Sequence, residues 1–111
     1  MEIITNEDNG IISVMIKGRL DADTAPEAEK ILENFLTRDH PRLLFDLSDH
    51  EYLSSADLRV ILRTAQEIQR KSGKFIICSL NNYVKEVFEI IGLQSHLPIA
   101  ESVDSGYEIF S

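Results

Sequence analysis

The period of the hydrophobic positions changes along this chain, from two residues near the N-terminus to three or four further on. Every second residue from Ile12 to Ile16 is a branched aliphatic, as expected of a strand with one buried face. The Asn9-Gly10 pair before it favours a tight two-residue turn, and residues 1–6 have the composition of a preceding strand. We therefore expect the chain to open with an antiparallel hairpin.

Four later stretches have apolar residues at helical spacing, and short apolar runs separate them. In the stretch 58–68 the apolar side chains recur at i, i+3, i+4, i+7 and i+10, which forms a stripe along one face of a helix. The runs 43–45, 74–79 and 97–100 are too short for helices and predict strands. The four predicted stripes are Ala28, Ile31, Leu32, Phe35 and Leu36; Leu58, Ile61, Leu62, Ala65 and Ile68; Val84, Val87, Phe88 and Ile91; and Val103, Tyr107 and Phe110.

Polar residues mark where the first two of these helices begin. Thr24 precedes Pro26 and Glu27, a combination that predicts a helix start with a capping box between the threonine and the glutamate. Ser54 and Ser55 lie between a polar loop and the second apolar stripe. One of the two serines is therefore expected to cap the second helix.

The predicted element order is β-β-α-β-α-β-α-β-α. Strands that alternate with helices after a hairpin form a mixed sheet with helices packed against it. With 43% hydrophobic and 27% charged residues, the composition is that of a globular protein. We expect an α/β fold in which residues 1–111 form a single domain.

The charge of the chain excludes several classes of partner. A formal net charge of -8 disfavours binding to nucleic acid or to an anionic membrane, both of which require a basic patch. No apolar run is long enough to cross a bilayer, and residues 1–10 lack a signal-peptide pattern. These features predict a cytoplasmic protein. The single cysteine, Cys78, falls in an apolar run and is expected to be a buried side chain on a strand.

The serine pair at the second helix permits two interpretations. A serine hydroxyl at this place can accept a hydrogen bond from a first-turn N–H and act only as a cap. The same place suits a phosphate group, because unpaired N–H groups and the positive end of the helix dipole point toward it. These local arguments leave both interpretations open.

Three motifs in order along the chain resemble those of the STAS family, and within it the small antagonists of anti-sigma factors. Residues 18–21, GRLD, followed by Thr-Ala at 24–25, are similar to the family sequence that leads into the first helix. Residues 44–48, LFDLS, are similar to its strand ending in D-L-S. Residues 52–62, YLSSADLRVIL, are similar to its Y-I-S-S-A-G-L-R-V-L-L helix start.

The resemblance implies a STAS-type (SpoIIAA-like) fold and a partner-switching function without enzymatic activity or a cofactor. In this family the antagonist binds an anti-sigma factor that is also a serine kinase, phosphorylation of the antagonist breaks the complex, and a PP2C-type phosphatase restores it. By motif match the phosphorylated residue is Ser55, with Ser54 as the alternative. The implied partner-binding residues are Asp21, Thr24, Asp46, Ser48, Leu53, Ser54, Ala56, Asp57 and Arg59.

One residue departs from the family pattern. Asp57 stands where the family has glycine, so it adds bulk and negative charge at a point where a partner backbone would approach. An acidic residue in the first turn also stabilises a helix. Two alternative functions stay open: a small-molecule or nucleotide-binding STAS module that uses the same helix start, and a scaffold component whose serine is never modified.

Catalytic and metal-binding interpretations are weaker. Ser55, His50 and either Asp46 or Asp49 contain the residue types of a hydrolase triad, but the chain has no G-x-S-x-G motif around the serine. Asp46 and Asp49 could bind a cation, yet we expect Asp46 to accept hydrogen bonds from loop N–H groups instead. His40, His50 and His96 lack metal-ligand spacing and are predicted on the surface. We predict no metal site.

Overall fold

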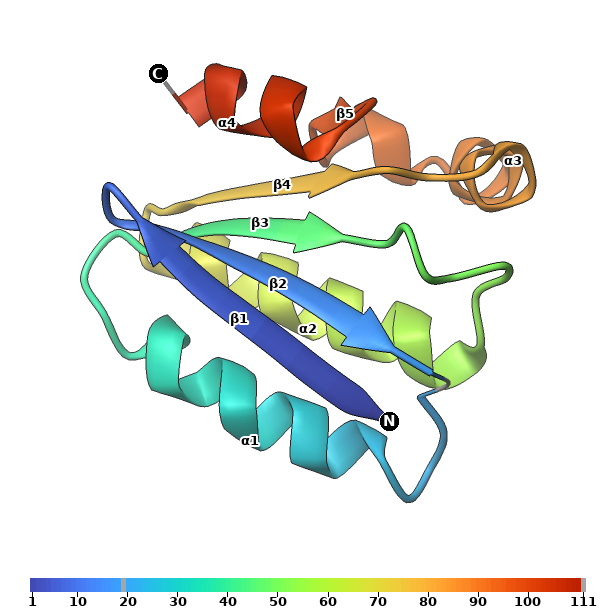
Figure 1. Cartoon of the computed structure of the whole chain (residues 1–111), viewed down its shortest axis with the longest axis horizontal. Helices are drawn as coiled ribbons and strands as arrows, with labels where there is room; N and C mark the ends of the chain where they lie inside the picture. Colours follow the sequence, from blue (N-terminus) through green and yellow to red (C-terminus); the bar gives the residue numbers. More distant parts are fainter. Residues whose placement is uncertain (19, 111) are drawn as a thin grey trace.

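The computed structural model describes residues 1–18 and 20–110, so Arg19, within the motif at 18–21, and Ser111 lie outside the described part. Figure 1 shows a mixed sheet with helices on both of its faces. The strands are β1 (Glu2–Asp8), β2 (Ile11–Lys17), β3 (Arg42–Asp46), β4 (Lys74–Cys78) and β5 (Ile99–Ala100). The helices are α1 (Ala25–Leu36), α2 (Ser55–Arg70), α3 (Asn82–Ile91) and α4 (Val103–Phe110), with a short 3₁₀ turn, η1 (Leu93–Ser95).

The order of these elements confirms the predicted α/β fold, and the 3₁₀ turn is the one addition within the described residues. The strands lie in the order β1-β2-β3-β4-β5. β1 pairs with β2 in an antiparallel ladder, whereas β2, β3, β4 and β5 are parallel. The predicted hairpin forms as expected: Asn9 and Gly10 have φ values of 53° and 78°, the left-handed conformation that a two-residue hairpin turn requires.

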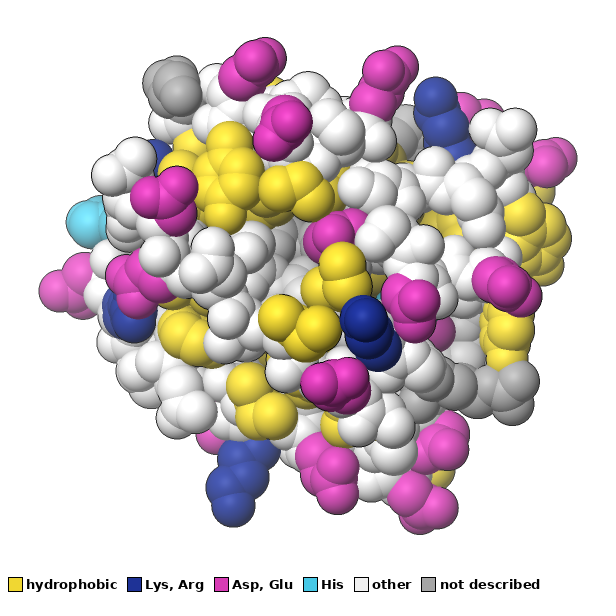
Figure 2. All heavy atoms as spheres, in the orientation of Figure 1, with side chains coloured by type: hydrophobic (Ala, Val, Ile, Leu, Met, Phe, Trp, Pro, Cys, Tyr) yellow, Lys and Arg dark blue, Asp and Glu magenta, His cyan; other side chains and the backbone are white. Residues whose placement is uncertain are grey.

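Two separate clusters of buried residues lie on the two faces of the sheet. On one face, side chains of β2, β3 and β4 pack against α1, α2 and α3. On the other face, Leu44, Ile76 and Cys78 pack against α4, and α4 lies across β4 from α1 and α2 in Figure 1. Cys78 is buried as predicted, and burial raises the pKa of its thiol to about 11. In Figure 2 the acidic side chains are spread over the visible surface.

The buried face of α2 is rotated relative to the predicted stripe. Val60 and Thr64 are buried together with Ile61 and Ile68, whereas Leu62, which was expected inside, is 42% exposed. The reason is that α2 packs against both α1 and the sheet, so two adjoining sides of the helix are covered and the polar Thr64 falls between them. The predicted inward residues Ile31 and Ile91 are likewise exposed.

α4 is held on its face of the sheet by contacts to residues at the starts of β3 and β4. The guanidinium of Arg42 lies 5.5 Å from the centre of the Phe110 ring and donates a hydrogen bond to the Phe110 carbonyl. Lys74 donates to the carbonyl of Ile109 at 3.1 Å. These cations meet the negative end of the helix dipole, where positive charge is stabilising.

Gly106 lets α4 approach the sheet closely, and replacing it is expected to destabilise the protein. A Cβ atom at this buried position would lie 2.6 Å from Cδ1 of Leu44. Gly106→Val should therefore lower the free energy of unfolding by about 2 kcal/mol, the usual scale for overpacking, as measured by urea denaturation. Glu108→Ala, on the exposed side of α4, is the control and should change it little; equal stability of the two variants would contradict the expectation.

Candidate functional site at the start of α2

Ser54 is the residue that caps α2. Its backbone is extended, with φ -83° and ψ 167°, and its Oγ accepts a hydrogen bond from the N–H of Asp57 at 3.0 Å. The carboxylate of Asp57 accepts in return from the N–H of Ser54 at 2.9 Å. This is a capping box, in which two otherwise unpaired N–H groups are satisfied reciprocally. It forms between Ser54 and Asp57, the residue that replaces the family glycine.

The two adjacent serines therefore differ in what their hydroxyls can do. The Ser54 Oγ is partly buried and lies 2.9 Å both from the carbonyl oxygen of Leu20 and from Oδ2 of Asp57. Its single proton can serve only one of these acceptors at a time, so the hydroxyl is fully engaged inside the protein. Ser55 is the first residue of α2 and is exposed.

Asp57 also forms a buried hydrogen bond with His50. Its Oδ1 lies 3.1 Å from Nε2 of His50, and the two residues are only 3% and 5% exposed. The prediction that His50 lies on the surface is wrong, because the loop after β3 turns inward through a hydrogen bond from the His50 N–H to the Leu47 carbonyl. Asp57 thus directs its charge into the protein and not toward a partner.

Hydrogen bonding determines the ionisation of Asp57. Burial alone would raise the pKa of this carboxyl group, but the hydrogen bonds from His50 and from the N–H and hydroxyl of Ser54 outweigh it. The pKa of Asp57 is consequently below its ordinary value of 3.8. A carboxylate that is ionised, buried and fully hydrogen-bonded keeps the turn before α2 in one conformation.

The loop between β3 and α2 is attached to three neighbouring elements. The N–H of Leu47 donates to the Cys78 carbonyl at the end of β4, and the N–H of Gly18 donates to Oδ2 of Asp49 at 3.1 Å. Asn81 donates from Nδ2 to the carbonyls of His50 and Glu51 at 3.2 and 3.1 Å. Its Oδ1 also caps α3 by accepting from the Val84 N–H, so one side chain joins the loop to α3.

Asp46 and Asp57 do not belong to the exposed surface, which corrects their prediction as partner-binding residues. Asp46 is 6% exposed, and its Oδ1 accepts from the N–H of Ser48 at 2.9 Å, as the loop-capping interpretation predicted. Both aspartates bond to neighbouring backbone N–H groups because the carboxyl ends of strands and the starts of helices carry such unpaired donors.

The capping box that was predicted between Thr24 and Glu27 at the start of α1 does not form. Thr24 is the N-cap of α1 but makes no side-chain capping bond to the helix. Its hydroxyl instead accepts from the N–H of Asp21 at 2.9 Å, while Oδ1 of Asp21 accepts from the N–H groups of Asp23 and Thr24. Asp21 and Thr24 therefore organise the turn before α1 through bonds to each other.

Four of the other predicted partner-binding residues lie at or near the surface. Ser48 and Arg59 are exposed, and Leu53 and Ala56 are half-buried. Ser55, Ala56 and Arg59 line a shallow hollow of about 340 Å³, together with residues of α1 and the turn before it. The structure thus brings the starts of α1 and α2 together beside the exposed serine.

The STAS domain family model matches residues 2–106. The chain belongs to the STAS family. It is 30% identical over 110 residues to BtrV of Bordetella bronchiseptica, a proposed anti-sigma factor antagonist, an alignment that covers 99% of this chain and 95% of BtrV. It is 26% identical to the anti-sigma-B factor antagonist of Listeria monocytogenes, with 86% of this chain and 84% of that protein covered.

The fold of this STAS protein is similar to that of solved family members. The crystal structure of a proposed anti-sigma factor antagonist from Thermotoga maritima superposes with a TM-score of 0.88 at 22% sequence identity. The superposition covers 96% of this chain and 92% of that one. The STAS-type fold expected from the three sequence motifs is thereby confirmed.

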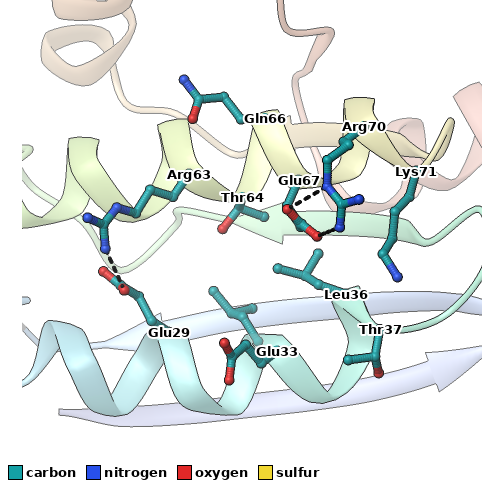
Figure 3. Close-up of a pocket in the computed structure, with 11 residues that line it drawn as sticks. Glu29, Glu33, Leu36, Thr37, Arg63, Thr64, Gln66, Glu67, Arg70 and Lys71 are labelled. Atoms are coloured by element: carbon teal, nitrogen blue, oxygen red, sulfur yellow. Dashed lines mark hydrogen bonds and ion pairs between the residues drawn. The ribbon is translucent and has the colours of Figure 1, made fainter.

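A larger groove of this STAS domain lies between α1 and α2 and shares Glu29 with the hollow beside Ser55. Figure 3 shows Arg63 of α2 reaching Glu29 of α1, at 3.0 Å, and Arg70 bonded to Glu67. The groove measures about 780 Å³ and is lined by three basic and three acidic side chains. These charges balance, so the groove provides no net charge to attract a charged ligand. Its exposed ion pairs also contribute little to stability.

Ser54, Asp57 and His50 of this STAS domain do not form a hydrolase triad, and the serine of the predicted triad, Ser55, is exposed at the start of α2. A triad requires the imidazole to contact the serine hydroxyl and the carboxylate to orient the imidazole. Here the carboxylate of Asp57 lies between the other two groups, and His50 pairs with Asp57 instead of Asp46 or Asp49. The Nδ1 atom of His50 is buried without a hydrogen-bond partner in the described structure.

Within 1–18 and 20–110, His, Cys, Asp and Glu side chains nowhere gather in threes as a metal site would require. No helix in this part of the STAS domain combines the length and apolar character needed to cross a membrane.

Proposed function

We propose that this protein is an anti-sigma factor antagonist that binds an anti-sigma factor with serine kinase activity and is released when Ser55 is phosphorylated. The names of BtrV and the Listeria protein support antagonism of an anti-sigma factor, and the kinase activity of that partner is what the family resemblance implies. The second part rests on one observation, the division of roles between the two serines: Ser54 is engaged as the cap, and Ser55 is exposed at the same helix start.

Ser55 is the better phosphoacceptor because modification there leaves the capping box intact. Phosphorylation of Ser54 would break the bonds of its Oγ to Leu20 and Asp57, and the new charge would lie beside the Asp57 carboxylate. At Ser55 the phosphate adds about -1.5 to -2 charges at the positive end of the α2 dipole, where negative charge is stabilising.

The phosphate acts on the partner and not on the fold. A partner surface that accepts a neutral serine has to desolvate a dianion once Ser55 is modified, and an imperfectly paired charge costs several kcal/mol. Arg59 is four residues further along α2, so it is on the same face as Ser55. We infer that phosphoserine 55 attracts Arg59 and removes that cation from the partner interface as well.

The proposed partner surface is what remains of the predicted set after the two buried aspartates are excluded. It comprises Asp21, Thr24, Ser48, Leu53, Ser54, Ala56 and Arg59, together with Ser55. The protein acts through residues 1–111 as one binding module without catalysis of its own, and a PP2C-type phosphatase returns it to the binding state.

Intact-mass measurement tests the phosphorylation site. Wild-type protein, incubated with ATP and the kinase-type anti-sigma factor encoded in the same genome, is expected to gain the mass of one phosphate group, and Ser55→Ala is expected to gain none. Ser54→Asn is the matched control, since asparagine is a good N-cap without a hydroxyl, and it should still be modified. Modification of Ser55→Ala at the wild-type rate would contradict the assignment.

The hollow beside Ser55 favours a second candidate, a nucleotide-binding module. It lies between the N-terminal ends of α1 and α2 and is bordered by Arg59, and helix N-termini bind phosphate groups. Titration with GTP and ATP by calorimetry distinguishes the two functions: the switch requires no direct binding to the isolated protein, whereas saturable binding that Arg59→Ala abolishes would support the module.

A further inference from the structure

α3 carries exposed apolar side chains on the flank next to the side that packs on the core. Tyr83, Ile90 and Ile91 are 59%, 76% and 48% exposed, and Val87 is half-buried among them. At helical spacing these four residues fall on one side of α3, and we refer to them as the α3 stripe. Figure 2 shows hydrophobic side chains at the right-hand edge of the molecule, where α3 lies in Figure 1.

The α3 stripe is more than scattered surface hydrophobicity. Single exposed apolar residues are common on soluble proteins, whereas contiguous apolar surface marks interaction sites. α3 has ten residues, of which Val84 and Phe88 are buried in the core, yet the flank next to these two is also apolar, while Lys85, Glu86 and Glu89 occupy the rest of the exposed surface. A helix that needed only to cover the sheet would carry polar residues there.

The α3 stripe begins next to the loop that leads to Ser55. Asn81 caps α3 and donates from the same side chain to the carbonyls of His50 and Glu51, so α3 and this loop are connected directly. Figure 1 places α3 and the start of α2 at the same end of the sheet, with the loop between them. A partner that docks over Ser55 from this end would also meet α3.

The surface around Ser55 needs such a neighbour. Apart from Leu53 and Arg59 its members are small or polar, and protein interfaces draw most of their binding energy from a few large side chains, above all tryptophan, tyrosine and arginine. A stable interface also covers about 800 Å² on each partner, more than one helix turn provides. Tyr83 and Ile90 add exposed aromatic and aliphatic anchors to Arg59 and the half-buried Leu53.

The charges beside the stripe indicate which protein covers it. Glu86 and Glu89 are exposed on α3 at positions bordering Ile90, and the whole chain has a net charge of -8. A second copy of the chain would bring like charges together, which disfavours association. A partner with apolar side chains bordered by lysine or arginine is complementary.

We propose that the α3 stripe is a second contact region for the anti-sigma factor, continuous with the Ser55 surface and responsible for the apolar part of binding. This inference rests on the proposed function. Binding at the Ser55 surface depends on whether Ser55 is phosphorylated, whereas the α3 stripe contributes affinity that is independent of phosphorylation.

Binding of the kinase-type anti-sigma factor to four forms of the full chain tests the proposal. The forms are wild type, Ile90→Asp, Ser55→Glu and the control Ile109→Asp, and binding is measured by calorimetry. We expect the Kd of Ile90→Asp to be at least tenfold higher than that of wild type, and the Kd of Ile109→Asp to be unchanged. Ile109 is 38% exposed on α4, whose C-terminal end lies at the opposite side of the molecule in Figure 1. Ile90→Asp should remain folded, because the side chain is largely in solvent.

The outcomes separate the proposal from the function on which it rests. If wild type binds, Ser55→Glu does not, and Ile90→Asp binds as wild type does, the α3 proposal is overturned and the switch stands. A change in self-association of the Ile90→Asp variant in sedimentation, without loss of partner binding, would assign the stripe to a second copy and overturn it too. If wild type fails to bind the anti-sigma factor, both proposals fail.

Discussion

Ser55→Glu is expected to weaken binding to the anti-sigma factor by about 100-fold while leaving the fold intact. A glutamate at this exposed first-turn position introduces a charge that the partner must desolvate. At ~1.4 kcal/mol per tenfold change, a 100-fold loss corresponds to about 2.7 kcal/mol, within the several kcal/mol expected for an unpaired interfacial charge. The helix dipole tolerates the added acid, so the free energy of unfolding should change by less than about 0.5 kcal/mol.

Ser55→Ala is the control for this substitution. It removes the hydroxyl without adding charge, and Ser54 continues to cap α2 through its bond to the Asp57 N–H. Its affinity should therefore match that of the wild type. Calorimetric Kd values and urea unfolding curves of the two variants provide the comparison. A glutamate variant that binds as tightly as the alanine variant would rule out a charge-operated switch at Ser55.

Asp57→Ala is expected to lower the free energy of unfolding by about 2–4 kcal/mol, because a buried donor left without its acceptor costs about 1–3 kcal/mol and a lost helix cap costs about 1 kcal/mol. The substitution leaves the imidazole of His50 buried without its acceptor and removes the carboxylate that bonds the Ser54 N–H. Urea unfolding at neutral pH measures the loss. Asp39→Ala, at an exposed loop position, is the control and should change stability little.

The effect of Asp57→Ala should also depend on pH in a defined direction. Because hydrogen bonds hold the pKa of Asp57 below its ordinary value of 3.8, its ionised form stabilises the folded state. That contribution is complete above the unfolded value and is lost as the pH falls through the folded pKa. The stability difference between wild type and variant should therefore be constant above about pH 5 and shrink below about pH 4. A difference that grew on acidification would contradict this assignment.

The structure also changes the meaning of the aspartate that replaces the family glycine. From sequence, Asp57 was expected to face a partner, because it stands where the family has glycine and where a partner backbone would approach. Its two oxygens are instead occupied by Ser54 and His50. The signal in the sequence was the spacing of Ser54 and Asp57, since a serine with an acidic side chain three residues on resembles a capping box. The same signal at Thr24 and Glu27 was misleading, because Thr24 bonds to Asp21.

The sequence alone determined the element order, the hairpin turn, the start of α2 at the serine pair and the family, because these depend on local periodicity, turn chemistry and contiguous motifs. It did not determine which side of α2 is buried, that His50 lies inside, or that Asn81 joins the loop to α3. Those features depend on contacts between residues 30 or more positions apart, and only the packing of α1, α2, α3 and the sheet determines which side chains meet.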